Sequence, residues 1–393
     1  MHNYGPATVA EFLDDLIVFR NLVPVDDRLP SLSIVREELN ISDNRIPRKT
    51  EPSYAHVVAN LLRSARSLEL PRVQLQCLIF IGDTRMNDGT AFSNLCDAGK
   101  WPGLAFIGSE TSEKPQVEIV PTGRWGHLYL SNRWEALTDF DDFCTEQGFC
   151  VDERTAVVVD LDKTALGARG RNEHVIDRAR VEAVRNTVSD LLGAGFNQSL
   201  FRHTYDILNQ VEFHPFTADN QDYLAYLCLI VGAGLYDLDS LTKHVVDKRL
   251  TTFREFIEQI HGRNHKLPLG LDAIHNKIYS RVQLGDPTPF KEFRYNEYCT
   301  TVDSMGKLMA DAKVDDLMKN EILITQEVRA LALAWRARGA LLFGLSDKPD
   351  EASLPRQELE RRGYMPIHRV ETHAVGNPGL TDSTPTITQS GPH

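Results

Sequence analysis

Two aspartates, Asp160 and Asp162, stand two residues apart in the segment VVVDLDKTA. They directly follow an apolar run, Thr155 to Val159, that is typical of a buried strand. Carboxylates at a buried strand end are costly unless something cationic binds them. The pair therefore predicts phosphoryl transfer, in which one carboxylate attacks phosphorus and the other handles protons on the leaving group and on water. A solvated turn or a helix cap is the alternative interpretation of DxDxT taken alone.

Two further apolar runs end in a polar residue where a loop is expected. Cys77 to Gly82 is followed by Asp83, and Ala340 to Leu345 is followed by Ser346. Runs of this kind are typical of buried parallel strands. Because ligands bind at the carboxyl ends of the strands in open α/β sheets, we expect Asp83, Asp160 and Ser346 to share one site.

Helical patterns precede two of these strands. Ser53 to Leu68 and Gln326 to Arg338 each place their apolar residues on one face, and Gly339 stands where a left-handed helix cap is expected. Alternation of helix and strand predicts an α/β fold with a three-layer, Rossmann-like parallel sheet. Between Leu166 and about Asn320 the pattern is mainly helical, which predicts an inserted helical domain.

These patterns divide the chain into five parts. The expected parts are an N-terminal helix and connector (1–40), a first part of the sheet core (41–165), a helical cap domain (166–320), a second part of the core (321–375) and a disordered tail (376–393). The N-terminal helix is predicted from Val9, Phe12, Leu13, Leu16 and Ile17, and the tail from its Thr, Pro, Ser and Gly content.

The strand ends resemble motifs of the haloacid-dehalogenase superfamily. The family's first motif, an apolar strand followed by DxDxT, matches Asp160, Asp162 and Thr164. Its second motif, an apolar strand that ends in Ser or Thr, resembles ALLFGLSDKP at Ser346.

Two more segments extend this resemblance. The family's third motif, a lysine that opens a helix, resembles RKTEPSYAHVV at Lys49. Its fourth motif, GDxxxxD after an apolar strand, is similar to LIFIGDTRMNDG at Asp83 and Asp88. Lys348, two residues after Ser346, is a rival for the lysine role, and the helix-opening context favours Lys49.

The resemblance implies a Mg²⁺-dependent phosphohydrolase that cleaves a small phosphorylated metabolite through an aspartyl phosphate on Asp160, with Asp162 as acid/base. Mg²⁺ prefers oxygen ligands, which these acids supply. The implied metal ligands are Asp160, Asp162 through its backbone carbonyl, Asp83 and Asp88. The implied phosphate contacts are Ser346, Thr164 and Lys49.

The motifs stand in rotated order. The family runs from the first to the fourth motif, whereas here Lys49, Asp83 and Asp88 precede Asp160, and Ser346 comes last. A circular permutation gives this pattern, with Asp139 to Glu153 as the new join. The helical insertion lies where the family places a cap, which implies a lid over the pocket.

Substrate contacts and the reaction type stay open at this point. The nearest candidates for substrate contacts are Arg169, Arg171, Asn172 and Lys348; a solvated basic turn is the alternative for the first three. A phosphomutase or phosphotransferase fits the motifs as well as a phosphatase does. A non-catalytic binding protein that has kept the fold is a further alternative.

Composition limits the partners. The 393 residues carry a net charge of -12, which argues against broad binding to nucleic acid or to an anionic membrane. The N-terminal segment lacks the basic start of a signal peptide, and the longest uncharged stretch, Tyr223 to Tyr236, is too short to span a bilayer and predicts a buried helix. Six cysteines are few for this length, so reduced thiols and a cytoplasmic location are expected. The oligomeric state is not predicted.

Overall fold

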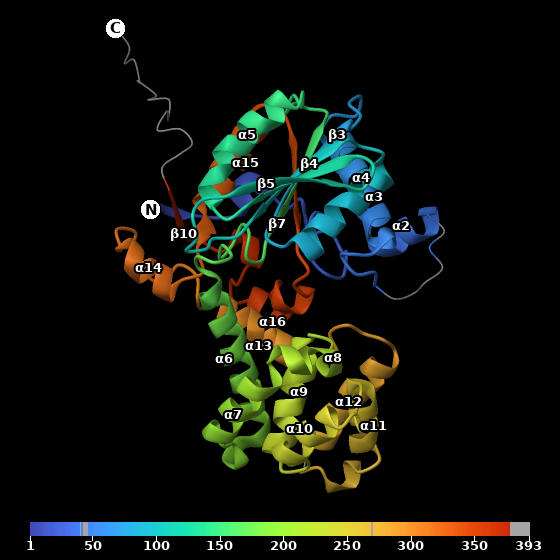
Figure 1. The fold of residues 1–393 in the computed structure, drawn as a ribbon. Coiled ribbons are helices and arrows are strands. Elements are labelled where there is room, and N and C mark those ends of the chain that lie inside the picture. The colour runs from blue at the N-terminus through green and yellow to red at the C-terminus, as the bar shows by residue number, and fades with distance from the viewer. Residues whose placement is uncertain (40, 42–45, 269, 378–393) are drawn as a thin grey trace.

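The computed structural model describes residues 1–39, 41, 46–268 and 270–377, and its centre is a seven-stranded sheet (Figure 1). Neighbouring strands are parallel, except that β5 runs antiparallel to β6 at one edge. The chain is therefore an α/β protein, as its three apolar runs predict. In sheet order the strands are Ile17–Val18 (β2), Leu341–Leu345 (β9), Thr155–Asp160 (β7), Cys77–Gly82 (β3), Gly103–Gly108 (β4), Gly126–Ser131 (β6) and Val117–Thr122 (β5).

Helices cover both faces of this sheet. Successive side chains of a strand point to opposite faces, so Leu78 and Phe80 of β3 join one apolar cluster while Ile79 and Ile81 join the other. The result is a three-layer arrangement compatible with a Rossmann-like fold. The first face packs against Leu32–Leu39 (α2), Pro52–Glu69 (α3) and Thr90–Gly99 (α4), and the second against Ala10–Leu13 (α1), Leu137–Glu146 (α5) and Gln326–Ala337 (α15).

The two predicted helices that precede strands are confirmed. Helix α3 begins at Pro52, whose fixed φ suits a first helical turn. Helix α15 ends at Ala337, and Gly339 follows with φ of +98°, the left-handed conformation expected of a glycine after a helix. The three predicted strands are also confirmed, because β3, β7 and β9 lie side by side in the centre of the sheet.

The predicted N-terminal helix is largely wrong. It lasts one turn, α1, because Asp14 adopts a positive φ of +48° and turns the chain. Ile17, which the pattern placed on the helix, lies in β2 and pairs with Gly344 of β9. The segment His2–Ala7 before the helix is a strand, β1.

Strand β1 belongs to a second, three-stranded sheet of order β1-β10-β8. It runs antiparallel to β10 (Thr372–Gly376), which is parallel to β8 (Ile324–Thr325). The first and last strands of the described chain are thus neighbours. Gly376, predicted to open the disordered tail, ends β10, and Asn377 after it donates through its backbone N–H to Glu327. The tail beyond Asn377 lies outside the described residues.

The segment Glu173–Val302 forms a helical lobe beside the sheet (Figure 1). Most of its buried apolar side chains make a core of their own, whereas a few of α6 and α13 pack in the core of the sheet: Val175, Ile176, Ala179 and Tyr298. The predicted buried helix is α9, whose residues from Leu224 to Val231 are all buried. The helices of the lobe are Glu173–Leu192 (α6), Gln198–Leu208 (α7), His214–Thr217 (α8), Gln221–Gly232 (α9), Leu238–Val246 (α10), Phe253–His261 (α11), Leu271–Gln283 (α12) and Lys291–Val302 (α13).

Two helices after the lobe lie outside it. Val314–Asn320 (α14) contributes Leu317 to a small cluster with Leu323 and Val375, next to the second sheet, although the sequence pattern assigned this segment to the helical insertion. Gln357–Glu360 (α16) is a short helix after β9. Among the described residues, no helix combines the length and the apolar character that crossing a membrane needs. All six cysteines are free thiols.

Candidate functional site

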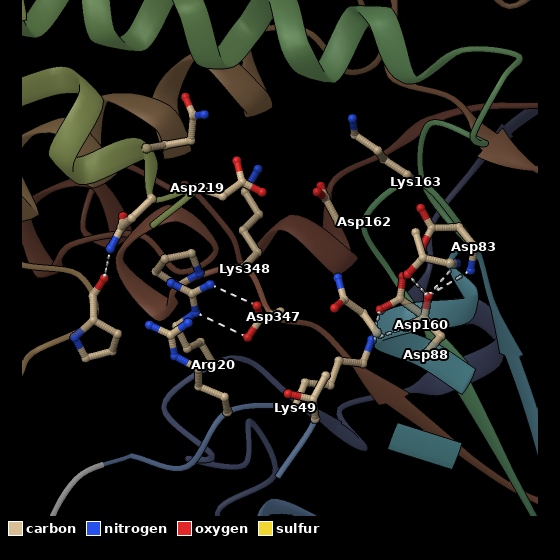
Figure 2. Close-up of a pocket in the computed structure, with 18 of the residues that line it drawn as sticks. Arg20, Lys49, Asp83, Asp88, Asp160, Asp162, Lys163, Asp219, Asp347 and Lys348 are labelled. Carbon is tan, nitrogen blue, oxygen red and sulfur yellow. Dashed lines mark hydrogen bonds and ion pairs between the residues drawn. The ribbon is translucent and has the colours of Figure 1, made fainter. Parts of the chain in front are cut away.

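A cavity of about 450 Å³ lies at the carboxyl ends of the central strands (Figure 2). Asp160 is the last residue of β7, Asp83 directly follows β3, and Asp347 lies two residues beyond β9. All three line the cavity. Because these strands are parallel neighbours, their carboxyl ends meet at one edge of the sheet. Of the three strand-end residues expected to share one site, Asp83 and Asp160 therefore lie together at the cavity, whereas Ser346 does not line it.

Three buried carboxylates gather at this edge. Asp83, Asp88 and Asp160 each have an oxygen within 4.8 Å of the others. Lys49, from the loop before α3, reaches them: its ammonium is 2.6 Å from Asp88 Oδ1 and also bonds to Asp160 Oδ1. We call these four residues the carboxylate cluster. Its members are at most 8% exposed, so their mutual interactions are only weakly screened by water.

Asp88 is held rigidly within the carboxylate cluster. Its Oδ2 accepts the N–H of Asp83 at 3.0 Å, the N–H of Thr84 at 2.8 Å and the hydroxyl of Thr84 at 3.0 Å. The π-helical turn Arg85–Gly89 brings the carboxylate back to these donors. Gly82 makes room, because a Cβ at this position would lie 2.5 Å from Asp88 Cβ. The glycine of the GDxxxxD segment is therefore required by packing.

With all three carboxyl groups ionised, the carboxylate cluster would hold more negative charge than Lys49 neutralises. Burial, together with the charge of Asp160, raises the pKa of Asp83 to about 9. Burial also raises the pKa of Asp160 to about 7, because the effect of Lys49 is smaller and Asp88 adds repulsion. Burial opposes the ionisation of Asp88 too, but Lys49 and the bonds to this carboxylate outweigh it, so the pKa of Asp88 is lowered.

The donor set fits a hard divalent cation. Three carboxylates in contact supply the oxygen ligands that Mg²⁺ prefers. The raised pKa values of Asp83 and Asp160 mean that a nearby positive charge would be stabilised there. Asp88 already directs both oxygens to protein donors, so Asp83 and Asp160 are the better ligands and Asp88 the better support.

Asp162 lies on the cavity side of the turn after β7 (Figure 2). Lys163, the next residue, has a positive φ of +65°, and its carbonyl accepts the N–H of Arg169 at 2.8 Å. The carboxylate of Asp162 lies 3.4 Å from Arg180 Nη2 of helix α6. Its side chain is 28% exposed, in contrast to that of Asp160, so water and a molecule in the cavity can reach it.

Arg169 is the only one of the three predicted basic-turn residues that lines the cavity within the described chain. Its Nε is 2.5 Å from Asp83 Oδ2. Arg171 instead bridges Glu110 and Glu327, and it is buried. Asn172 is buried as well and bonds to the backbone of Glu321 and Leu323, among others. Neither reaches the cavity, and the alternative of a solvated turn is wrong for both.

Ser346 and Thr164, the implied phosphate contacts, are both buried. The hydroxyl of Ser346 accepts the N–H of Lys348 at 3.1 Å, and the residue is 1% exposed. Thr164 is fully buried, and its hydroxyl has no hydrogen-bond partner among the described residues. Both follow strand ends as predicted, but neither belongs to the cavity lining.

The two candidate lysines occupy different places. Lys49 is part of the carboxylate cluster, whereas the ammonium of Lys348 lies 3.2 Å from Thr301 Oγ1 and 3.6 Å from Glu297 Oε1 in the helical lobe. Both line the cavity (Figure 2). The geometry places Lys49 against Asp160, as its helix-opening context predicts.

Several cavity residues escaped the sequence prediction. The lobe contributes Arg180, Asn220 and Arg294, and the N-terminal segment contributes Arg20, which pairs with Asp347 at 2.9 Å. Arg294 and Glu297 lie three residues apart on α13, a spacing visible in the sequence. Nothing local shows that this helix face meets α6 and the loop after β9.

Comparison with protein-family models, with curated proteins and with solved structures finds no match.

Proposed function

We propose that the protein is a Mg²⁺-dependent phosphohydrolase that cleaves a small phosphomonoester through an aspartyl phosphate on Asp160. The observation that carries this proposal is the buried contact of Lys49 with both Asp160 and Asp88, beside Asp83, at the floor of a cavity. A carboxylate attacks a phosphate only where nearby cations offset their repulsion. The carboxylate cluster offers Lys49 and an oxygen-ligand site for that purpose.

The proposed reaction has two steps. In the first, Asp160 Oδ attacks phosphorus, the bond from phosphorus to the ester oxygen breaks, and Asp162 donates a proton to the leaving alcohol. In the second, Asp162 takes a proton from water as the water oxygen attacks phosphorus, which releases inorganic phosphate and restores Asp160. Bound Mg²⁺ would supply charge neutralisation of the phosphoryl oxygens, with Asp83 and Asp160 as its ligands.

Sheet topology supports the resemblance to a permuted haloacid-dehalogenase fold. The strand of the first motif, β7, lies between β9 of the second motif and β3 of the fourth. A circular permutation changes the order of the motifs along the chain but not which strands are neighbours in the sheet. The ends of the three strands therefore stay together. The pairing of β1 with β10 puts the two ends of the described chain side by side, which a permutation requires. Helix α5 occupies the expected join.

The helical lobe supports the proposal of a cap. Residues 218–220, between α8 and α9, and the first residue of α9, Gln221, line the cavity together with the acids at the strand ends. Ala218 and Asp219 both have positive φ, near +50°, an uncommon conformation for residues other than glycine. Asn220 holds this turn by donating to Pro287 O at 2.9 Å and accepting the N–H of Asp222. A rigid lobe loop thus faces the carboxylate cluster across the cavity.

The test is phosphate release from a panel of phosphomonoesters, with Mg²⁺ and with excess chelator. Asp160→Asn is expected to abolish release, and Asp162→Asn to slow it about 10²–10⁴-fold, the usual contribution of a general acid or base. Asp219→Asn is the matched control, because this acid lines the same cavity outside the carboxylate cluster. Release that survives in Asp160→Asn or in chelator would refute the mechanism.

The products separate the proposal from its rivals. Inorganic phosphate in amounts equal to the alcohol indicates hydrolysis, whereas an isomerised phosphoester with little free phosphate indicates a mutase. If neither product forms but a phosphomonoester still binds, the result favours a non-catalytic binding protein.

A further inference from the structure

A second group of cations lines the cavity. Arg180 of α6, Arg294 of α13 and Lys348 after β9 all border it and all surround the carboxylate of Glu297. The guanidinium of Arg180 lies 3.0 Å from Glu297, that of Arg294 lies 2.6 Å away, and the ammonium of Lys348 lies 3.6 Å away. We call these four residues the Glu297 cluster.

The Glu297 cluster has more positive than negative charge. Glu297 is 1% exposed, and the three cations keep it ionised: burial alone would raise its pKa, but Lys348, Arg294 and Arg180 outweigh burial and lower it. Of the acids that the structure describes, the only other fully buried one in contact is Asp222, which pairs with Arg294 at 2.5 Å. Among the described residues, three cations therefore share two buried carboxylates.

Two further acids touch this group, but water screens them. Asp162 and Asp177 lie 3.4 and 3.5 Å from Arg180, and their side chains are 28% and 46% exposed. Partly exposed pairs contribute little. Although burial lowers the pKa of Arg180, these two acids raise it together with Glu297. Because water screens these acids, they offset the buried surplus of one positive charge only in part, and an anion in the cavity would stabilise what is left.

The Glu297 cluster is also separate from the carboxylate cluster. Lys49 forms ion pairs with Asp160 and Asp88, whereas Lys348 donates a hydrogen bond to Thr301 and lies near Glu297. An ammonium has three donors; Lys348 uses one of them for the Thr301 hydroxyl, and Glu297 lies 3.6 Å away as an ion-pair partner. Arg180 approaches the carboxylate cluster through Asp162, which lies two residues after Asp160.

We infer that the substrate carries a second anionic group, and that Arg180, Arg294 and Lys348 bind it while the phosphoryl group lies at Asp160. This inference rests on the proposed phosphohydrolase function and adds the substrate class: a phosphomonoester with a carboxylate or a second phosphate at its other end. Both groups offer oxygens to guanidinium and ammonium donors, and charge-assisted hydrogen bonds of this kind are strong.

The test uses inhibitors, so it does not require the natural substrate. Hydrolysis of p-nitrophenyl phosphate is inhibited with ω-phosphonocarboxylates of increasing chain length, each matched with the alkylphosphonate that has a methyl group in place of the carboxylate. A parallel series of alkane bisphosphonates tests the phosphate alternative. At the best chain length, we expect a compound of one of these two series, with its second anionic group, to bind at least tenfold more tightly than the matched alkylphosphonate. Equal inhibition constants at every length in both series would overturn the inference.

Variants locate the second anionic group. Lys348→Gln is expected to remove most of the tenfold preference without changing inhibition by alkylphosphonates, and Lys348→Arg to restore it. Arg48→Gln is the matched control, because Arg48 is an exposed cation of the same cavity outside the Glu297 cluster. A preference that persists in Lys348→Gln but falls in Arg48→Gln would assign the second anion to the cavity mouth and refute the site proposed here.

Failure of the two proposals is distinguishable. If no phosphomonoester is hydrolysed, the phosphohydrolase proposal fails. If p-nitrophenyl phosphate is hydrolysed and the protein does not prefer inhibitors with a second anionic group over the matched alkylphosphonates, only the proposed site for the second anionic group is refuted. The comparison of inhibitors on the unaltered protein keeps the test decisive even where a variant does not fold.

Discussion

Replacement of Lys49 by methionine tests whether the carboxylate cluster needs its cation. Methionine keeps much of the length of lysine and removes the charge. In the wild type Lys49 bonds to Asp88 and Asp160, and although burial disfavours the ammonium, these two carboxylates raise its pKa well above its usual range. Without it, the buried acids lose their cation. Breaking a buried ion pair by removing one partner typically costs about 3–5 kcal/mol.

The cost should depend on pH, because a carboxyl group can take up a proton instead. A carboxyl group that is ionised when unfolded, with an ordinary pKa of 3.8, and protonated when folded lowers stability by about 1.4 kcal/mol per pH unit. The stability lost through one such carboxyl group therefore cannot exceed about 6 kcal/mol at pH 8 and about 2 kcal/mol at pH 5. A folded pKa raised above the unfolded one gives stability that is present at low pH and lost as pH rises. Lys49→Met should therefore lose about 3–5 kcal/mol at pH 8 and less than about 2 kcal/mol at pH 5.

The assay is urea unfolding followed by tryptophan fluorescence with a chelator present. All four tryptophans, at positions 101, 125, 134 and 335, lie outside the helical lobe, so the signal reports on the part that holds Lys49. Arg48→Met is the control, since substitution of an exposed neighbour should change stability by less than about 0.5 kcal/mol. Mg²⁺ should stabilise Lys49→Met more than the wild type. A loss below about 1 kcal/mol at pH 8, or one independent of pH, would refute the account of the cluster.

Two substitutions and one titration test separate features. Gly82→Ala should cost about 1–3 kcal/mol, the usual range for overpacking, and weaken stabilisation by Mg²⁺, because the new methyl group displaces Asp88; calorimetric melting with and without Mg²⁺ measures both. Asp350→Asn should raise the urea midpoint at pH 7.5 and leave it unchanged at pH 4, because burial raises the pKa of Asp350 to about 6 and an amide oxygen can still accept the N–H of Asn21. His275 should stay neutral in an NMR titration down to about pH 4, because burial lowers its pKa to about 4 and Tyr226 contacts its Nδ1 at 2.6 Å. Since this folded pKa lies below the ordinary value of 6.5, the lobe should lose stability as pH falls from 6.5 towards 4.

Local signals predicted the strands and their acids, because apolar runs and strand-end carboxylates are properties of short segments. The contact between Lys49 and Asp160 required the resemblance to a known family, since the two residues are 111 positions apart. The sheet of β1, β10 and β8 could not be predicted, because it joins segments more than 300 residues apart and its short strands lack an apolar run. Arg171 and Asn172 were misplaced because their buried partners, such as Glu327 and Leu323, come from a distant segment.

A thermodynamic cycle on Asp222 and Arg294 tests whether the buried charges beside the cavity are coupled. Asp222 is fully buried, pairs with Arg294 at 2.5 Å and accepts the N–H of Phe290 at 2.9 Å. Asp222→Asn and Arg294→Met should each cost about 3–5 kcal/mol, because each leaves the other charge buried with fewer partners. The double variant should lose clearly less than the sum, with a coupling of about 1–3 kcal/mol for groups in one network.

Arg202 and Asp206 on α7 provide the matched control for this cycle. They form an ion pair of similar length, 2.9 Å, but their side chains are 59% and 50% exposed. Exposed pairs four residues apart on a helix contribute about 0.3–0.5 kcal/mol, so the same cycle should show little coupling. Far-UV circular dichroism during urea unfolding follows the lobe. Equal coupling in the two pairs would mean that burial does not strengthen the interaction, and the surplus charge of the Glu297 cluster would then provide no driving force for binding an anion.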